Sequence, residues 1–280
     1  MRISDLEILV IKDGFARTDG GGMFGLVPKV MWEKKYPADE YNRVPMWMNC
    51  LLIRDGEHNI VVDTGYGNKL SHRTRELLGI EETGLLPERL VERGVTLDQV
   101  DLVINTHLHG DHCGGNTTRY GEQLVPTFPK ATYIMQRAEW EAAMNTNERT
   151  RATYLPENLL PLQEAGCIEF IDGDTQVTPH VRCVVTTGHN SSHQGVLVES
   201  DGQQAFYLAD LAPYTVHIER IPWVPAYDLD PMGTIETRRR IRDWAVENHV
   251  LLIFDHDPEV EMGYLHNDSG HYWVEPVDGE

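Results

Sequence analysis

The chain contains 280 residues and carries a formal net charge of -20, from 44 acidic and 24 basic side chains. A field of this sign repels phosphate backbones, which disfavours nucleic acid as a partner. The chain is long enough to bury a sizeable core, and it has no apolar run of the length that a membrane-spanning helix needs. Residues 1–7 lack the apolar core of a secretory signal, so we expect a cytoplasmic protein with no membrane partner.

The first half of the chain predicts short strands alternating with helices. Strands are expected at 3–10, 49–54, 59–63, 100–104 and 131–135, and helices at 70–78, 85–94 and 137–145. The glycine-rich segment 19–25 predicts a tight, exposed turn. The region that follows is unusually apolar for a loop, with Met23, Phe24, Trp32 and Trp47. It is either a flap packed on the domain or a wall of a substrate pocket, and it is a candidate homodimer contact.

The second half is richer in strands. These are expected at 167–171, 181–186, 195–199, 204–209 and 250–254, with an amphipathic helix at 232–247. Residues 146–161 are polar and contain two prolines, which predicts an irregular connection across the surface. This connection is too short to be a linker, so we expect a single domain over residues 1–280. Strands of both halves end in His or Asp, which suits two facing β-sheets with helices outside.

A metal-ligand motif follows the apolar run at 100–104. The side chains of His107, His109, Asp111 and His112 lie within six residues, in the pattern His-x-His-x-Asp-His. Buried together without partners, they would carry a large desolvation cost. A pair of divalent cations removes that cost, because imidazole nitrogens and carboxylate oxygens are suitable ligands for zinc-like metals. The alternative is a solvated polar loop. Asp63, at the tip of an earlier strand, is expected to accept an N–H from a metal-bound imidazole or to cap the helix at 70–78.

Further candidate ligands stand at the ends of later strands, namely His189, Asp210 and His256. In chain order, Asp-Thr-Gly, His-x-His-x-Asp-His, Gly-His-x-x-x-His, a strand-terminal Asp and a late His resemble the metallo-β-lactamase-fold hydrolases. The resemblance covers nearly the whole chain and implies an α/β fold, an αββα sandwich of two facing mixed β-sheets with helices on the outer faces.

The resemblance also implies a dinuclear metal centre. One cation would be held by His107, His109 and His189, and the second by Asp111, His112 and His256, with Asp210 bridging both. Zinc is the expected metal, although manganese, iron or cobalt also suit nitrogen and oxygen ligands. We expect Cys113, which directly follows this motif, to be a packing thiol rather than a ligand.

Within this family the chain is most similar to the group containing bacterial quorum-quenching lactonases. The residues that carry this likeness are 19–29, Trp32, Ala209-Asp210-Leu211, His217 and Tyr227-Asp228. Two positions depart from the group. Ala209 stands where glycine commonly precedes the bridging Asp, and Pro213 stands where many homoserine-lactone hydrolases have a tyrosine, with Tyr214 one residue later.

The expected chemistry is hydrolysis of a small-molecule lactone or ester by a metal-bridging hydroxide. Asp111 would orient this nucleophile and carry its proton to the leaving group, and Tyr214 is a candidate to assist the oxyanion. A phosphotriesterase or a thioesterase would use the same metals with a different pocket. Di-iron oxygen reductases resemble His-x-Glu-x-Asp at the motif, whereas this chain has His109 in the Glu place. A metal-binding protein without enzymatic activity is the alternative from another class.

The remaining polar candidates have more ordinary interpretations. We expect His193 to order the ligands from outside rather than bind metal. His217 either faces the substrate or has a packing role. Glu139 and Glu141 are expected on the exposed face of the helix at 137–145.

Overall fold

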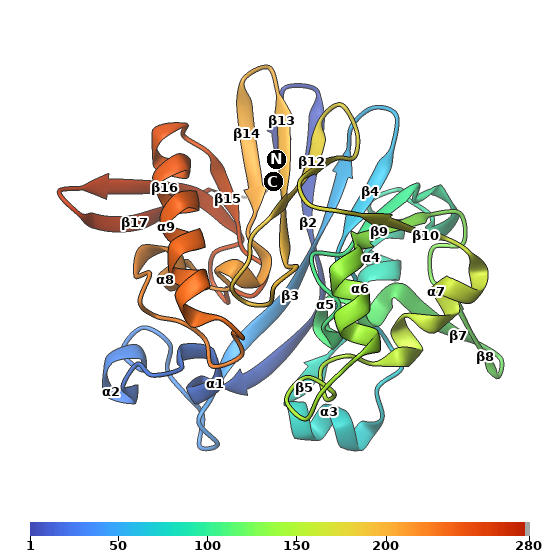
Figure 1. Cartoon of the computed structure of the whole chain (residues 1–280), viewed down its shortest axis with the longest axis horizontal. Coiled ribbons are helices and arrows are strands. Elements are labelled where there is room, and N and C mark those ends of the chain that lie inside the picture. Colours follow the sequence, from blue (N-terminus) through green and yellow to red (C-terminus); the bar gives the residue numbers. More distant parts are fainter. Residues whose placement is uncertain (278–280) are drawn as a thin grey trace.

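Two β-sheets face each other within residues 1–277, the part of the chain that the computed structural model describes, and helices cover both outer sides (Figure 1). The first sheet has the order β1 (Arg2–Ile3), β2 (Leu6–Asp19), β3 (Arg43–Arg54), β4 (Asn59–Val62), β6 (Leu102–Ile104), β9 (Thr132–Gln136) and β10 (Ile168–Ile171), with β5 (Ile80–Glu82) paired to β2. The second has the order β11 (Thr175–Gln176), β12 (Val181–Val185), β13 (Gln194–Ser200), β14 (Gln203–Tyr207), β15 (Leu251–Ile253), β16 (Met262–Asp268) and β17 (His271–Pro276). Both sheets are mixed, as predicted.

The main core lies between the sheets. Ile53, Val62 and Ile104 from the first sheet form one fully buried cluster with Val196 and Leu251 from the second. Because successive side chains of a strand point to opposite faces, the other faces of both sheets need separate cover. That requirement explains why strands such as β4 and β15 are apolar almost throughout.

Helices bury the outer faces of the sheets. The first sheet packs against α4 (Leu86–Glu92), α6 (Arg137–Met144) and α7 (Leu160–Ala165). The second packs against α9 (Pro231–Glu247), which buries Ile241 and Ala245. This helix begins one residue before the predicted start. Pro231 occupies its first turn, and the Asp230 carboxylate accepts from the Gly233 N–H at 3.0 Å. The structure therefore has the layers helix, sheet, sheet, helix.

Shorter elements connect these layers. They are α1 (Gly20–Phe24), α2 (Lys29–Trp32), α3 (His72–Leu78), α5 (Gly110–Cys113), α8 (Thr215–Glu219), the 3₁₀ turns η1 (Leu97–Gln99), η2 (Gly114–Asn116), η3 (Pro156–Asn158) and η4 (Ala209–Leu211), and the hairpin β7 (Thr117–Tyr120) with β8 (Gln123–Pro126). Ser71, rather than Asp63, caps α3, because its hydroxyl accepts from the Thr74 N–H. The capping role expected for Asp63 is therefore wrong. In residues 1–277 no helix is both long and apolar enough to cross a membrane.

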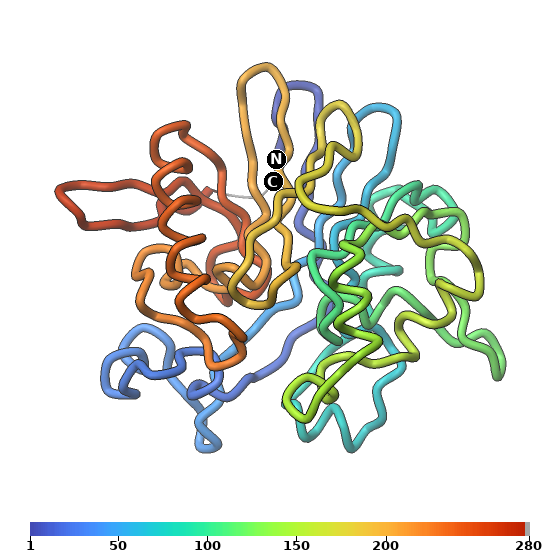
Figure 2. The backbone as a smooth tube through the Cα atoms, in the orientation of Figure 1, coloured from blue at the N-terminus to red at the C-terminus, as the bar shows by residue number. Residues whose placement is uncertain are grey.

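The glycine-rich segment near residue 20 does not form the exposed turn that we expected. It forms α1, in which Met23 and Phe24 are buried. A Cβ at Gly22 would lie 2.1 Å from the Tyr227 hydroxyl, so the missing side chain lets α1 pack closely on the later segment. The backbone trace shows the two segments side by side (Figure 2), joined by a hydrogen bond from Ala226 N to Gly22 O.

The apolar region after α1 is a packed flap. The Phe24 ring stacks on Trp32 and Tyr36 with ring centroids 4.9 and 5.3 Å apart. Burying large aromatic rings supplies much of the stability of such a cluster. Phe24 and Trp32 are therefore covered within the chain itself, and the homodimer contact expected here stays a prediction without support from these two side chains.

Strand direction decides where polar side chains gather. The strands β4, β6 and β9 are parallel neighbours, and β14 and β15 are parallel neighbours in the other sheet. Parallel strands bring their carboxyl ends to the same edge, where ligand sites of α/β folds commonly lie. The loops that follow β4, β6, β12, β14 and β15 carry the predicted metal ligands and Asp63. The fold therefore predicts one site at this edge.

Candidate metal centre and substrate cavity

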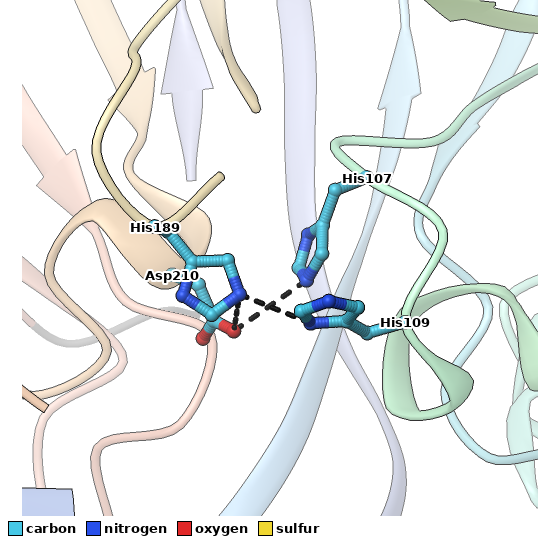
Figure 3. A group of neighbouring side chains, drawn as sticks. All are labelled: His107, His109, His189 and Asp210. Carbon is cyan, nitrogen blue, oxygen red and sulfur yellow. Dashed lines mark hydrogen bonds and ion pairs between the residues drawn. The ribbon is translucent and has the colours of Figure 1, made fainter. Parts of the chain in front are cut away.

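One group of candidate ligands converges from both sheets. His107 and His109 follow β6, whereas His189 follows β12 and Asp210 lies in η4 after β14 (Figure 3). The Nε2 atom of His189 lies 3.0 Å from Nδ1 of His109 and 3.1 Å from Oδ2 of Asp210. His107 Nε2 lies 3.5 Å from the same Asp210 oxygen. These distances fit ligand atoms that surround a single cation.

A second group lies on the other side of Asp210. The Nε2 atoms of His112 and His256 are 3.3 Å apart, and they lie 3.6 and 3.4 Å from Oδ2 and Oδ1 of Asp210. The carboxylate of Asp111 is 3.9 Å from His112 Nε2 and 3.8 Å from His256 Nε2. Asp210 thus belongs to both groups, and all seven residues predicted as ligands lie together.

Hydrogen bonds outside the centre orient its imidazoles. His112 Nδ1 contacts Asp63 Oδ2 at 2.9 Å, and His256 Nδ1 contacts the Trp47 carbonyl at 2.6 Å. Both partners accept, so each Nδ1 carries a hydrogen, and each Nε2 is the nitrogen that faces Asp210 and is available to a cation. Asp63 therefore accepts an imidazole N–H, as the sequence predicted.

His189 is held in the same way by a residue that the sequence did not single out for this role. Its Nδ1 lies 3.0 Å from Oδ1 of Asp228, whose Oδ2 accepts from the Thr234 hydroxyl at 2.7 Å. The position of Asp228 relative to His189 depends on a long loop, so spacing along the chain carried no signal for this contact. Asp228 fixes His189 as Asp63 fixes His112.

The chemistry of these groups fits divalent cations. Burial, followed by the neighbouring His112 and His109, lowers the pKa of His107 well below its ordinary value, so this imidazole is neutral. Its Nε2 atom is buried and has no hydrogen-bond partner among residues 1–277. Although burial opposes ionisation, His189 and His112 hold the pKa of Asp210 well below its usual range. Converging lone pairs and a buried carboxylate are stabilised by a cation, so these residues are suited to bind metal.

A further carboxylate, Asp255, stands beside His256. It is buried, and its Oδ2 lies 3.2 Å from His256 Nε2. Burial raises the pKa of Asp255 to about 7. In the described part of the chain, His112, Asp210, Asp255 and His256 form one group whose donor atoms all lie within 4.8 Å of one another. Asp255 is not among the ligands predicted from the sequence, although it directly precedes one of them at a strand end.

Glu139 corrects another expectation. It is buried rather than exposed, and its carboxylate accepts hydrogen bonds from Leu108 N at 3.0 Å and Ser192 Oγ at 2.6 Å. Tyr154 Oη and Asn190 Nδ2 also donate to it, at 2.9 and 3.2 Å. Leu108 comes from the loop after β6, and Asn190 and Ser192 come from the loop after β12, so Glu139 ties together the two loops that carry the first group of candidate ligands.

The centre forms the polar end of a cavity with a volume of about 410 Å³. His109, Asp111, His189, Asp210 and His256 line this end, whereas much of the remaining lining is apolar, with Met23, Met46, Leu70, Leu155, Pro225 and Leu229. Met23 thus connects the packed flap to the cavity, so both interpretations of the flap hold in part. A cavity of this kind suits a small molecule with one polar and one apolar end.

The polar connection after α6 forms one wall of this cavity. Arg149, Thr150, Thr153 and Leu155 line it, so residues 146–161 are more than the surface connection that we expected. The Arg149 guanidinium donates to the Ala226 carbonyl at 2.7 Å, which joins this wall to another lining segment of the cavity. The segment also contains η3 and the start of α7, which the prolines at 156 and 161 begin rather than break.

Tyr214 does not line the cavity. Its side chain is buried in the aromatic cluster with Phe24 and Tyr36, and its hydroxyl donates to the Pro45 carbonyl at 2.5 Å. This packing gives no support to the predicted role of Tyr214 with the oxyanion. The tyrosines that line the cavity are Tyr66 and Tyr227, of which Tyr66 follows the Asp-Thr-Gly motif.

The other uncertain side chains have packing or supporting positions. His217 is buried, with Nδ1 accepting from Tyr214 N and Nε2 donating to the Met23 carbonyl, so it packs rather than facing the cavity. His193 Nδ1 lies 2.8 Å from Thr186 Oγ1, and its ring stands behind His107 with centroids 5.2 Å apart. The Cys113 thiol donates to the Leu108 carbonyl at 3.2 Å, as expected for a packing thiol.

Comparison with known proteins decides the family. Residues 48–256 match the metallo-beta-lactamase superfamily. The chain belongs to that superfamily. It is 30% identical to an N-acyl homoserine lactonase from Bacillus cereus over 230 residues, which cover 79% of this chain and 84% of the relative.

Solved structures agree on the fold. A probable metal-dependent hydrolase from Staphylococcus aureus has a TM-score of 0.90 and 28% identity, with 99% of each chain covered. AidC, a dizinc quorum-quenching lactonase in complex with a product, has a TM-score of 0.83 at 18% identity, which shows the fold alone; the match covers 99% of this chain and 96% of AidC. With its dinuclear His and Asp metal site, this superfamily member is a metal-dependent hydrolase.

Proposed function

We propose that this hydrolase opens lactones, and that N-acyl homoserine lactones are its first substrates to test. The observation that carries the proposal is a cavity whose polar end is the His and Asp centre and whose walls are largely apolar. An acylated lactone has the matching form, a polar ring with an apolar chain. The Bacillus cereus relative is an N-acyl homoserine lactonase, which supports this choice. As part of the same proposal, the enzyme would act in the cytoplasm and quench signals of this kind.

The proposed ligand sets follow the observed groups. His107, His109 and His189 would hold one divalent cation, and Asp111, His112 and His256 would hold the other, with Asp210 shared between them. Zinc is our first choice of metal, and manganese, iron and cobalt are compatible with the same donors. When bound, such a pair of cations lowers the pKa of a coordinated water and polarises a substrate carbonyl.

Asp111 is the residue that we propose for proton transfer. Its carboxylate lies between the centre and the cavity, within 3.9 Å of His112 Nε2 and lining the space that a substrate would occupy. A carboxylate in this position is able to accept a proton from the attacking water. The same group then returns the proton to the alkoxide that leaves when the lactone ring opens.

Tyr66 replaces Tyr214 as our candidate for stabilising the oxyanion. Burial raises the pKa of the Tyr66 hydroxyl well above its ordinary value, and the nearby Asp111 and Asp210 raise it further. The hydroxyl therefore stays protonated and is able to donate a hydrogen bond from the cavity wall. Tyr66→Phe should lower kcat for a lactone without changing the amount of bound metal, whereas Tyr214→Phe should leave kcat nearly unchanged in the folded fraction.

A substrate panel tests the proposed function. Purified protein reconstituted with zinc, manganese or cobalt is assayed on N-acyl homoserine lactones of increasing chain length, a simple lactone, an aryl ester, a phosphotriester and a thioester. We expect the highest kcat/KM on a lactone, and a fall in KM as the acyl chain fills the apolar walls. Higher kcat/KM on the phosphotriester or the thioester than on every lactone would replace our assignment with that activity.

A further inference from the structure

We propose that Asp255 is a direct ligand of the second divalent cation, together with His112, Asp210 and His256. This adds a ligand to the set that the family motifs predict. The inference depends on the dinuclear site and not on which substrate the enzyme hydrolyses.

Burial makes the carboxylate of Asp255 an unusual group. The residue is 1% exposed, and neither of its carboxylate oxygens has a hydrogen-bond partner among residues 1–277. Removing a carboxylate from water without hydrogen bonds is costly, so buried carboxylates in native proteins are bonded to donors or bind a cation.

The neighbouring carboxylate Asp257 shows what an ordinary structural role looks like. It is also buried, but its Oδ2 accepts from Thr215 N at 2.8 Å. Its Oδ1 accepts from Glu259 N at 2.9 Å and from Val260 N at 3.0 Å. Two residues apart in the same loop, one carboxylate is thus satisfied by backbone donors and the other is not.

The carboxylate of Asp255 lies beside the other donor atoms of the second group. Its Oδ2 lies 3.2 Å from His256 Nε2. If both atoms were about 2.1 Å from one cation, this separation would correspond to an angle of roughly 100° at the metal, which is normal for adjacent ligands. His256 donates its Nδ1–H to the Trp47 carbonyl, so Nε2, beside the Asp255 oxygen, is the nitrogen available to a cation. A shared cation would bond to both atoms.

The consequence is a difference between the two metal positions. His107, His109 and His189 give the first position a majority of nitrogen ligands. With Asp111, Asp210 and Asp255, the second position has a majority of oxygen ligands beside His112 and His256. Oxygen ligands favour harder cations, so manganese should compete with zinc better at the second position than at the first.

Cobalt titration of metal-free protein tests the ligand assignment without an activity assay. We would compare the natural chain with Asp255→Asn and Asp255→Ala, using Asp257→Asn as the matched control, and follow both bound cobalt per chain and the visible absorption of the ion. We expect both Asp255 variants to bind the second cobalt at least about tenfold more weakly, with the first unchanged and an altered visible spectrum. Asp257→Asn should retain both affinities and the spectrum of the natural chain.

Thermal unfolding provides a second readout. Without metal, Asp255→Asn should unfold at the same temperature as the natural chain or higher, because a buried carboxylate without a hydrogen-bond partner has gone. On adding metal, the variant should gain less in Tm than the natural chain. Unchanged cobalt affinities and spectrum would overturn the proposal. An equal metal-induced gain in Tm would overturn it as well. Both results are expected if Asp255 only shares a proton with His256 and does not bind the cation. Turnover of lactones enters none of these measurements, so the two proposals fail separately.

Discussion

The two sheets contribute to the proposed metal centre in different ways. After β6, the first sheet supplies His107, His109, Asp111 and His112 from one continuous loop. The second sheet supplies His189, Asp210 and His256 from loops after three different strands. The first set is therefore positioned mainly by local structure, whereas the second requires that β12, β14 and β15 are correctly paired.

Buried carboxylates outside the donor set hold the imidazoles in place on both sides. Asp63 fixes His112 on the side of the first sheet, and Asp228 fixes His189 on the side of the second. Glu139 joins the two by accepting from Leu108 N and Ser192 Oγ. These outer carboxylates therefore support metal affinity from outside the donor set, because an imidazole that can rotate binds metal less tightly.

The largest expected effect comes from the continuous loop. Asp111→Ala removes a proposed ligand and the proposed proton carrier together, so kcat/KM should fall by about 1,000-fold. Bound metal, measured by elemental analysis, should drop from two equivalents toward one, because the second position is weakened. Asp111→Asn serves as a companion that keeps the side-chain volume. Near-natural turnover with two bound metals in Asp111→Ala would show that this carboxylate does neither task.

Substitution of the supporting carboxylates should have a smaller effect and should distinguish the two halves of the centre. Asp63→Asn and Asp228→Asn each leave an imidazole without its charged acceptor, so metal affinity should fall by about 10- to 100-fold. The affected position should differ, with Asp63→Asn weakening the cation beside His112 and Asp228→Asn weakening the cation beside His189. Chelator competition measures the two affinities separately. If both variants weaken the same cation, the pairing of each carboxylate with its own half is wrong.

The same contrast explains what the sequence allowed us to predict. The motif around His107 is visible because its candidate ligands are neighbours in the chain, and strand ends in His or Asp pointed to the remaining candidates, which the structure brings to the same place. Glu139 was missed because helix periodicity places residues on faces but does not show which donors a distant loop brings to them. Tyr214 was chosen by counting along the chain from Asp210, whereas aromatic packing directs its ring away from the cavity. The cavity wall at 146–161 is built by tertiary packing of polar residues, which leaves no periodic signal.

His193 tests whether the second sheet supplies His189 rather than its near neighbour as a ligand. His193 lies outside both groups of donors in residues 1–277 and contacts Thr186 through Nδ1. His193→Ala should therefore keep two metals and lose less than about tenfold in kcat, as expected for a residue that supports ligands from behind. Metal content and kcat are measured below the unfolding temperature of the variant. Loss of a whole metal equivalent would mean that His193, and not His189, binds the cation.

The smallest expected effect concerns the backbone that presents Asp210. Ala209 is buried with φ of +45°, a left-handed conformation that costs a residue with a Cβ about 1–2 kcal/mol. Ala209→Gly removes this strain, but two effects oppose the gain. Loss of the buried methyl group lowers the free energy of unfolding by about 0.8 kcal/mol, and the greater entropy of the unfolded chain lowers it by about 0.4–1 kcal/mol. Since these contributions offset one another, the free energy of unfolding should change by less than about 1 kcal/mol, with two metals still bound.

Valine at the same position provides the contrast. Ala209→Val places a β-branched side chain in the left-handed region and adds volume to a packed core, so it should cost more than about 2 kcal/mol and weaken metal binding through Asp210. Chemical denaturation of the metal-free proteins separates the two variants. If Ala209→Gly lowered the free energy of unfolding as much as Ala209→Val, packing of the Ala209 methyl group would outweigh backbone strain at this position.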